Sequence, residues 1–177
     1  MEDRILNIFK KWESEPSLDA LTRKQLADLE GKDDLIVDAF YRELEFGTAG
    51  LRGVIGVGSN RMNVYTVRRA TQGLANYLNR HYENPKVAIA YDSRNFSKVF
   101  AYESANVLSS NGIEAHIFDT LQATPCLSYA VRYLKCAGGI MITASHNSKE
   151  YNGYKVYDDT GCQLLPEDVK FIVEEIN

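Results

Sequence analysis

Residues 139–155 read GIMITASHNSKEYNGYK and contain two strand patterns joined by a polar loop. The apolar run 140–142 is typical of a buried strand, and it leads into a polar loop centred on Ser145. The chain returns through an Asn-Gly pair at 152–153 into a second strand pattern at 154–157. Because ligands of open α/β sheets bind at the carboxyl ends of strands, this loop is the candidate site.

Strand and helix patterns alternate around this stretch. Further strand patterns cover 87–91 and 113–118, and helical stripes cover 64–78, 97–110, 124–134 and 166–176, with Ser97 expected to cap its helix. The connection before residues 154–157 is too short for a crossover, so that strand should pair antiparallel. We expect an α/β protein, a three-layer α/β/α sandwich around a mixed, mostly parallel sheet of about four strands.

Residues 1–43 form a separate helical pattern in three pieces, punctuated by Pro16 and Gly31. We expect an N-terminal helical extension over 1–43 and an α/β domain over 44–177. The periodicity leaves open whether the extension packs on that domain or on a partner.

Composition excludes several classes of protein. The net charge is −4, with 20 basic and 24 acidic residues, and without a long basic stripe no nucleic acid is expected. The 3 cysteines are widely spaced and form no CxxC pair, which indicates reduced thiols and no zinc site. No signal-peptide core and no stretch of about 18 apolar residues occurs, so we expect no membrane partner and a cytoplasmic location.

Glycines are dense in residues 46–60, where they let backbone amides approach an anion closely. Arg52 lies among them, and its forked guanidinium suits a phosphate or a carboxylate. Gly56 and Gly58 do not form a dinucleotide fingerprint, because Arg61 occupies the place of the third glycine. By composition alone, an ordinary loop remains the alternative.

Ser145 is the strongest nucleophile candidate, because its hydroxyl lies beside the His146 imidazole and Lys155 follows closely. The alternative is a polar turn in which Ser145 and Asn147 cap backbone groups. A serine hydrolase is a weak third possibility, because the glycines of a nucleophile elbow are missing.

Two strings carry a family resemblance. TASHNSKEYNGYK, at 143–155, resembles the phosphoserine loop of the α-D-phosphohexomutase family, which includes phosphoglucomutase and phosphomannomutase. LEFGTAGLRG, at 44–53, looks like the amino-terminal signature of the same family. The Thr-Ala-Gly spelling, the leading Glu-Leu-Glu-Phe and the helical extension are most similar to the branch of type-two phosphoglucomutases and phosphopentomutases.

The resemblance implies a phosphosugar mutase, an isomerase that works by intramolecular phosphotransfer. Phosphorylated Ser145 would pass its phosphoryl group to a phosphosugar, and the bisphosphate intermediate would reorient and return the other group. Mg²⁺ is implied as a cofactor that touches a phosphoryl oxygen on Ser145, and a sugar bisphosphate is implied as the activator.

The resemblance also implies roles for individual residues. The implied catalytic group is Ser145, His146 and Lys155. The implied substrate- or phosphate-binding side chains are Arg52, Thr48 and Asn147. The side chains implied to support the loop are Arg94, Asp92 and Asn152; for Arg94 a plain structural ion pair remains open.

This chain departs from the family in one large respect, because the family enzymes have four domains and only the first is matched. The aspartate-rich metal loop, the sugar-specificity loop and the carboxyl-terminal phosphate loop are missing, and Asp158 with Asp159 forms only a turn pair. We therefore expect the remaining domains of the same enzyme as partners and little activity from this piece alone. The alternative is a non-enzymatic phosphate- or partner-binding module, and the coding region beyond Asn177 discriminates between the two.

Overall fold

The computed structural model describes residues 2–47 and 50–176, and its elements follow the predicted alternation. In chain order they are α1 (Asp3–Glu13), α2 (Ala20–Leu29), α3 (Asp33–Phe40), β1 (Leu51–Val54), α4 (Val64–His81), β2 (Lys86–Tyr91), α5 (Ser97–Ser110), β3 (Glu114–Ile117), α6 (Thr124–Tyr133), β4 (Gly138–Ile142), β5 (Tyr151–Tyr157) and α7 (Pro166–Ile176). Pro16 and Gly31 fall in the gaps between α1, α2 and α3, as their sequence positions predict.

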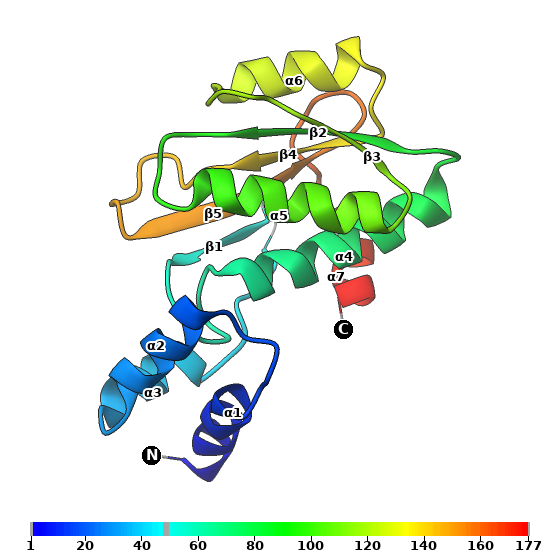
Figure 1. The fold of residues 1–177 in the computed structure, drawn as a ribbon. Coiled ribbons are helices and arrows are strands. Elements are labelled where there is room, and N and C mark those ends of the chain that lie inside the picture. The colour runs from blue at the N-terminus through cyan, green and yellow to red at the C-terminus, as the bar shows by residue number, and fades with distance from the viewer. Residues whose placement is uncertain (1, 48–49, 177) are drawn as a thin grey trace.

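The sheet is mixed, as expected, and its strand order is β1-β5-β4-β2-β3 (Figure 1). Strand β2 pairs parallel with β3 and β4, and β5 pairs antiparallel with β4, as the short connection predicts. The expected number of about four strands is too low, because β1 adds a fifth by pairing antiparallel with β5. Sequence analysis missed β1 because this short edge strand contains a glycine and is defined by its partner.

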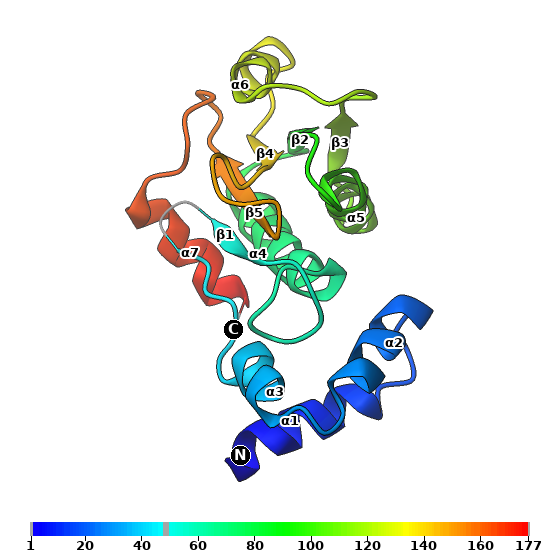
Figure 2. The ribbon, with the colours of Figure 1, turned by 90° about the vertical axis from the view of Figure 1, so that its left-hand side faces the viewer.

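Helices cover both faces of the sheet, which confirms the three-layer architecture (Figures 1 and 2). Helices α4, α5 and α7 supply one large apolar core, which includes Leu74, Leu108 and Ile172. Helix α6 covers the opposite face, where Leu127 and Val131 pack beside Met141 of β4. The parallel strands are therefore buried between two helical layers, as their apolar sequences require.

Helices α1, α2 and α3 form a lobe that extends from one end of the sheet domain (Figure 1). The lobe has its own core, in which the rings of Phe9 and Trp12 meet the buried Phe40 edge to face, with centroids 5.6 and 5.7 Å away. Trp12 also contacts Tyr65 of α4, and Val57 joins the same core. The helical extension therefore packs on its own sheet domain, which answers the question that periodicity left open.

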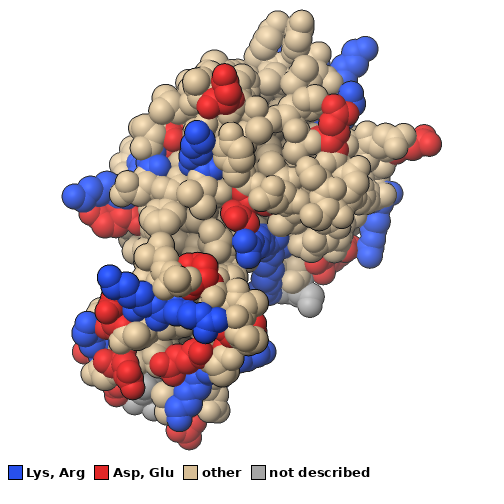
Figure 3. Space-filling view, in the orientation of Figure 1, with Lys and Arg blue, Asp and Glu red and all other residues tan. Residues whose placement is uncertain are grey.

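Acidic and basic side chains lie close together on the helical lobe (Figure 3). Over residues 2–47 and 50–176, none of the helices is both long enough and apolar enough to traverse a lipid bilayer.

Candidate active site

The sheet has a topological switch point between β2 and β4, because the chain continues from β2 to β3 on one side and from β4 to β5 on the other. The chain leaves β2 through α5 on one face and reaches β4 from β3 through α6 on the other face. The loops that follow β2 and β4 therefore diverge from neighbouring parallel strands, and such a crevice is where α/β proteins bind ligands. Asp92 is the first residue after β2, and Thr143 is the first after β4.

Ser145 lies at the exposed turn of the loop that joins β4 to β5. Its backbone has φ of 55°, in the left-handed region that side-chain-bearing residues rarely adopt. Its N–H donates to the Thr143 hydroxyl at 3.0 Å, and its own Oγ lies 3.4 Å from His146 Nδ1. The serine is thus presented to solvent by a defined backbone, with the imidazole beside it.

Arg94 anchors this loop from the neighbouring strand end. Its side chain is only 14% exposed, and its Nε lies 3.4 Å from Asp92 Oδ2. The guanidinium donates to four backbone carbonyl oxygens, those of Ser145 (2.7 Å), Asn147 (2.6 Å), Ser148 (2.8 Å) and Tyr151 (3.1 Å). One planar fork therefore satisfies a run of loop carbonyls that no regular secondary structure would pair.

Asp92 organises the same corner by accepting from three donors. The backbone N–H of Arg94 reaches Oδ1 at 3.0 Å, the Ser97 hydroxyl reaches Oδ1 at 2.7 Å, and the Thr143 hydroxyl reaches Oδ2 at 2.6 Å. The prediction that Ser97 caps its helix is wrong. Helix α5 begins at Ser97 itself, after Phe96 with φ of 63°, and the hydroxyl is engaged by the carboxylate instead.

Asn152 supports the Asp92 loop from β5. It is fully buried, and its side-chain NH₂ donates to the Asn95 carbonyl at 3.0 Å and to Ser97 Oγ at 2.9 Å. Its side-chain oxygen accepts the Gly153 N–H at 2.8 Å. The amide is therefore satisfied on both sides and ties β5 to the carboxyl end of β2.

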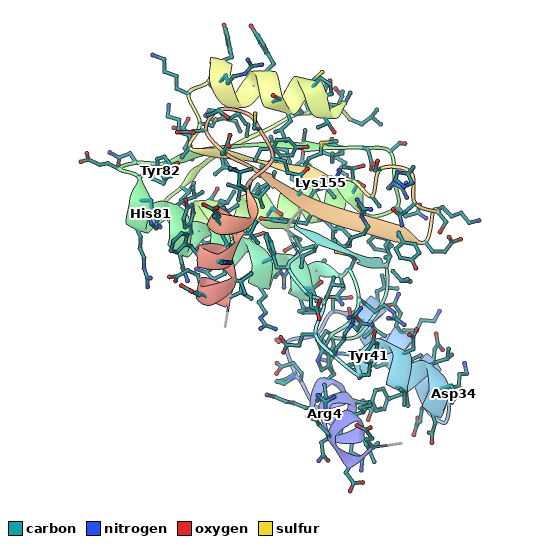
Figure 4. The ribbon with its side chains drawn as sticks, turned by 180° about the vertical axis from the view of Figure 1, so that it is seen from behind. Arg4, Asp34, Tyr41, His81, Tyr82 and Lys155 are labelled. Atoms are coloured by element: carbon teal, nitrogen blue, oxygen red, sulfur yellow. The ribbon has the colours of Figure 1, made fainter. Side chains whose placement is uncertain are left out.

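Arg52 and Lys155 lie on one face of the antiparallel β1–β5 pair. Arg52 is directly opposite Gly153, and Lys155 follows two residues later on the same side of the strand. Arg52 Nη1 donates to Asn147 Oδ1 at 3.2 Å. This bond connects the β1–β5 pair, here called the ribbon, to the loop between β4 and β5 that carries Ser145, here called the serine loop. Burial first, and then the Arg52 charge, lower the pKa of Lys155. Figure 4 shows Lys155 on β5, well away from Arg4 and Tyr41 in the helical lobe.

One glycine of the 46–60 segment has a reason different from the expected approach to an anion. Gly50 has φ of +99°, and a Cβ there would lie 1.9 Å from the Tyr154 carbonyl oxygen. Glycine therefore allows β1 to lie close against β5 and places Arg52 in register.

Thr48 lies outside the described residues. Asp158 accepts from the backbone N–H groups of Thr160 and Cys162, at 2.9 and 3.0 Å, so it forms the expected turn.

The chain is similar to one family of known proteins over most of its length. The family described as Phosphoglucomutase/phosphomannomutase, alpha/beta/alpha domain I, matches residues 43–177. The chain belongs to this family. Phosphoglucomutase of Staphylococcus saprophyticus is 52% identical over 138 residues, which are 78% of this chain and 25% of that protein. Phosphoglucomutase of Staphylococcus haemolyticus is 45% identical over 159 residues, which are 82% of this chain and 29% of that protein.

A solved structure agrees with this membership. A crystal structure from Thermus thermophilus, assigned provisionally as a phosphomannomutase, has a TM-score of 0.71 and 33% identity over 77% of this chain and 30% of that chain. The parafusin phosphoglucomutase of Paramecium, with a TM-score of 0.63 and 23% identity, shares the fold. The chain spans about a quarter of the length of the curated phosphoglucomutases that it matches.

The Mg²⁺ that the family resemblance implies would need oxygen ligands such as carboxylates. Among residues 2–47 and 50–176, no cluster of three or more His, Cys, Asp or Glu side chains could hold a metal ion. Asp92 does not provide one, because its oxygens already accept from Arg94, Ser97 and Thr143. The described part of this family domain therefore lacks a ready-made magnesium site, and a contact through a phosphoryl oxygen on Ser145 stays a prediction.

Sequence reasoning missed the Thr143 hydroxyl of this candidate site and gave the Ser97 hydroxyl a different role, that of a helix cap. Thr143 occupies the same place after β4 that Asp92 occupies after β2, and these strands are parallel neighbours. No strand order was predicted, so the sequence did not show that these two strands are neighbours, and the proton donor and acceptor become clear only from the side-chain geometry.

Proposed function

We propose that this chain is the phosphoserine-bearing domain of a phosphosugar mutase, and that Ser145 carries the transferred phosphoryl group. The main support is the anchored loop at the switch point, where Arg94 binds the backbone and leaves the Ser145 hydroxyl exposed. A serine that served only as a turn-forming residue would not need a buried guanidinium to hold its carbonyl oxygen.

The charges around the loop suit an anion. A phosphoserine carries about −1.5 to −2 charges near neutral pH. Arg52 and Lys155 lie on the ribbon beside the loop, and Arg52 already contacts it through Asn147. Arg52 can direct its remaining N–H groups to phosphoryl oxygens, while His146 donates from beside Ser145 Oγ.

The transfer step can be written with its protons. A hydroxyl oxygen of the phosphosugar attacks phosphorus, the bond from phosphorus to Ser145 Oγ breaks, and the hydroxyl proton passes to a base. The leaving Ser145 Oγ takes up a proton from the solvent to which the residue is exposed. Lys155 is the candidate base, because its lowered pKa enlarges the neutral fraction that can accept a proton. After the bisphosphate reorients, the reverse step returns its other phosphoryl group to Ser145 and leaves the isomeric phosphosugar.

The sugar contacts and the metal ligands belong in this proposal to other domains of a longer protein. The described residues offer no metal cluster of their own, and the relatives are several times longer. The isolated 177-residue chain should therefore fold but catalyse little turnover.

Intact-mass measurement and phosphopeptide mapping of the native protein from its source cells test this function. We expect one phosphoryl group on Ser145, its loss in Ser145→Ala together with mutase turnover, and its retention in the matched loop variant Ser148→Ala. Wild-type turnover in Ser145→Ala would refute the role of Ser145. An unmodified Ser145 in a native protein that ends at Asn177 and lacks mutase turnover would favour the phosphate- or partner-binding module.

A further inference from the structure

Thr143 links the two strand ends of the switch point through a single hydroxyl group. The residue is 8% exposed and lies between the buried strand β4 and Ser145. Its Oγ1 is 2.6 Å from Asp92 Oδ2 and 3.0 Å from the backbone nitrogen of Ser145. Both contacts are short enough to be ordinary hydrogen bonds.

The chemical groups themselves determine which atom donates and which accepts in each of these two hydrogen bonds. A hydroxyl has one proton, and the Asp92 carboxylate can only accept, so the Thr143 proton points to Asp92. The lone pairs of Thr143 Oγ1 are then left for the Ser145 N–H, which can only donate.

Asp92 is itself held in place, so the hydroxyl is positioned as well as oriented. Its other oxygen, Oδ1, accepts from the Arg94 N–H and the Ser97 hydroxyl. Asp92 and Thr143 are 51 residues apart in the sequence, but they follow neighbouring parallel strands. The Asp92 carboxylate thus fixes the position of the Thr143 hydroxyl from outside the serine loop.

The backbone of Ser145, whose N–H donates to Thr143, has a conformation that requires stabilisation by its neighbours. Ser145 has φ of 55°, a conformation that glycine adopts readily and serine does not. Because a change in φ at Ser145 moves its Cβ, the bond to its N–H defines the position from which Oγ projects.

We propose that Thr143 is a positioning residue for Ser145: its hydroxyl transfers the orientation of the Asp92 carboxylate to the Ser145 backbone and aims Oγ at its phosphoryl acceptor. The catalytic consequence rests on the proposed role of Ser145 as phosphoryl carrier. The geometric part of the proposal, that Thr143 orients the Ser145 backbone, does not rest on that role. The geometric part and the catalytic part can therefore be measured separately.

Amide hydrogen exchange of the 177-residue chain tests the geometric part. Thr143→Val keeps the shape of the side chain but removes the hydroxyl, and we expect exchange at the Ser145 N–H to become about tenfold faster. Thr143→Ser keeps the hydroxyl and should exchange as the wild type does. Unchanged exchange in Thr143→Val overturns the proposal, and so does equally fast exchange in both variants, because side-chain shape would then be responsible.

A second variant keeps the test decisive. If Thr143→Val does not fold, Asp92→Asn replaces it, because an amide cannot fix the hydroxyl proton as a carboxylate does. Faster Ser145 exchange in Asp92→Asn supports the proposal, and unchanged exchange overturns it.

The initial rate at which Ser145 of the native protein is phosphorylated tests the catalytic part. We expect an initial rate of Ser145 phosphorylation by a sugar bisphosphate about 10- to 100-fold lower in Thr143→Val, with recovery in Thr143→Ser. Wild-type protein that takes no phosphate on Ser145 refutes the proposed function, while the exchange result still decides the role of Thr143. Wild-type phosphorylation rates in Thr143→Val overturn the positioning role even if Ser145 is the carrier.

Discussion

The serine loop and the helical lobe are held in opposite ways. In the loop, the buried Arg94 binds backbone carbonyls and Asp92 collects three donors, so polar groups from one strand end position the other. In the lobe, the rings of Phe9 and Trp12 meet the fully buried Phe40 edge to face, and apolar packing holds the helices together.

The difference shows what each region requires. Apolar packing is non-directional and yields stability in proportion to buried area, which suits the core of the helical lobe. Hydrogen bonds to a guanidinium are directional and yield little net stability, but they fix where a backbone lies. The first kind of region should therefore lose stability when it is mutated, and the second should lose function.

Arg94→Ala should have the largest effect and should act on function. Loss of the fork frees the loop carbonyls, so we expect phosphorylation of Ser145 in the native protein to fall on the order of 100-fold. The unfolding free energy should fall by only about 1–3 kcal/mol, as measured by urea denaturation. Arg68→Ala is the control, because Arg68 is ion-paired with Glu103 and does not touch the loop. A variant that keeps normal phosphorylation would remove the functional half of the comparison.

Phe40→Ala should have the next largest effect and should act on stability. Removal of this fully buried ring should lower the unfolding free energy by about 3–5 kcal/mol. Amide exchange at residues 143–150 should change little, because none of these residues belongs to the core of the lobe. Phe171→Ala, at a ring that is 51% exposed, is the matched control and should change stability by less than about 1 kcal/mol. Exchange that accelerates equally in lobe and loop would show one cooperative unit instead of two.

Asp19 provides a smaller test, because it is a polar anchor within the lobe. It caps α2 by accepting from the Thr22 N–H at 2.9 Å, and it also accepts from the Tyr65 hydroxyl of α4 at 2.9 Å. We expect Asp19→Ala to cost about 1 kcal/mol, measured by urea denaturation at neutral pH.

The same residue makes a prediction about pH. Hydrogen bonds, that of the Thr22 side chain first, lower the pKa of Asp19 to about 2 from an ordinary 3.8. The unfolded chain therefore takes up the proton first as pH falls, so the contribution of Asp19 is complete above 3.8 and is lost towards about 2. The difference in stability between wild type and Asp19→Ala should shrink over that window. A constant difference would show that the carboxylate charge contributes nothing to the cap.

Lys155 gives the smallest expected effect, a shift in a titration curve. Burial and the Arg52 charge lower its pKa from 10.5, so Arg52→Gln should raise it, as followed by the ¹³Cε chemical shift. The unfolded chain holds this proton to higher pH, so wild-type stability should rise between the lowered pKa and 10.5 relative to Lys155→Met. A pKa that stays the same or falls in Arg52→Gln would separate Lys155 from Arg52 and weaken its proposed role as base.

Much of the molecule could be predicted from local sequence. The apolar run at 140–142, the return strand and the three helical pieces before residue 43 follow from periodicity and punctuation, and each is present. Strand β1 could not be found in this way, since its pairing depends on residues about 100 positions away. The assignment of Ser97 as a cap failed for a related reason, because Asp92 competes for its hydroxyl.

The family, the α/β alternation and the polar loop that carries Ser145 follow from the residues alone, because these depend on residue types at short spacing. The contacts that hold that loop are defined by the folded chain. The bonds from Arg94 to the loop carbonyls and from Thr143 to Asp92 span more than 50 residues, and they exist because two parallel strands end side by side. Periodicity predicts which residues are buried, whereas a hydrogen bond depends on the distance and angle between two atoms, which only the folded chain defines.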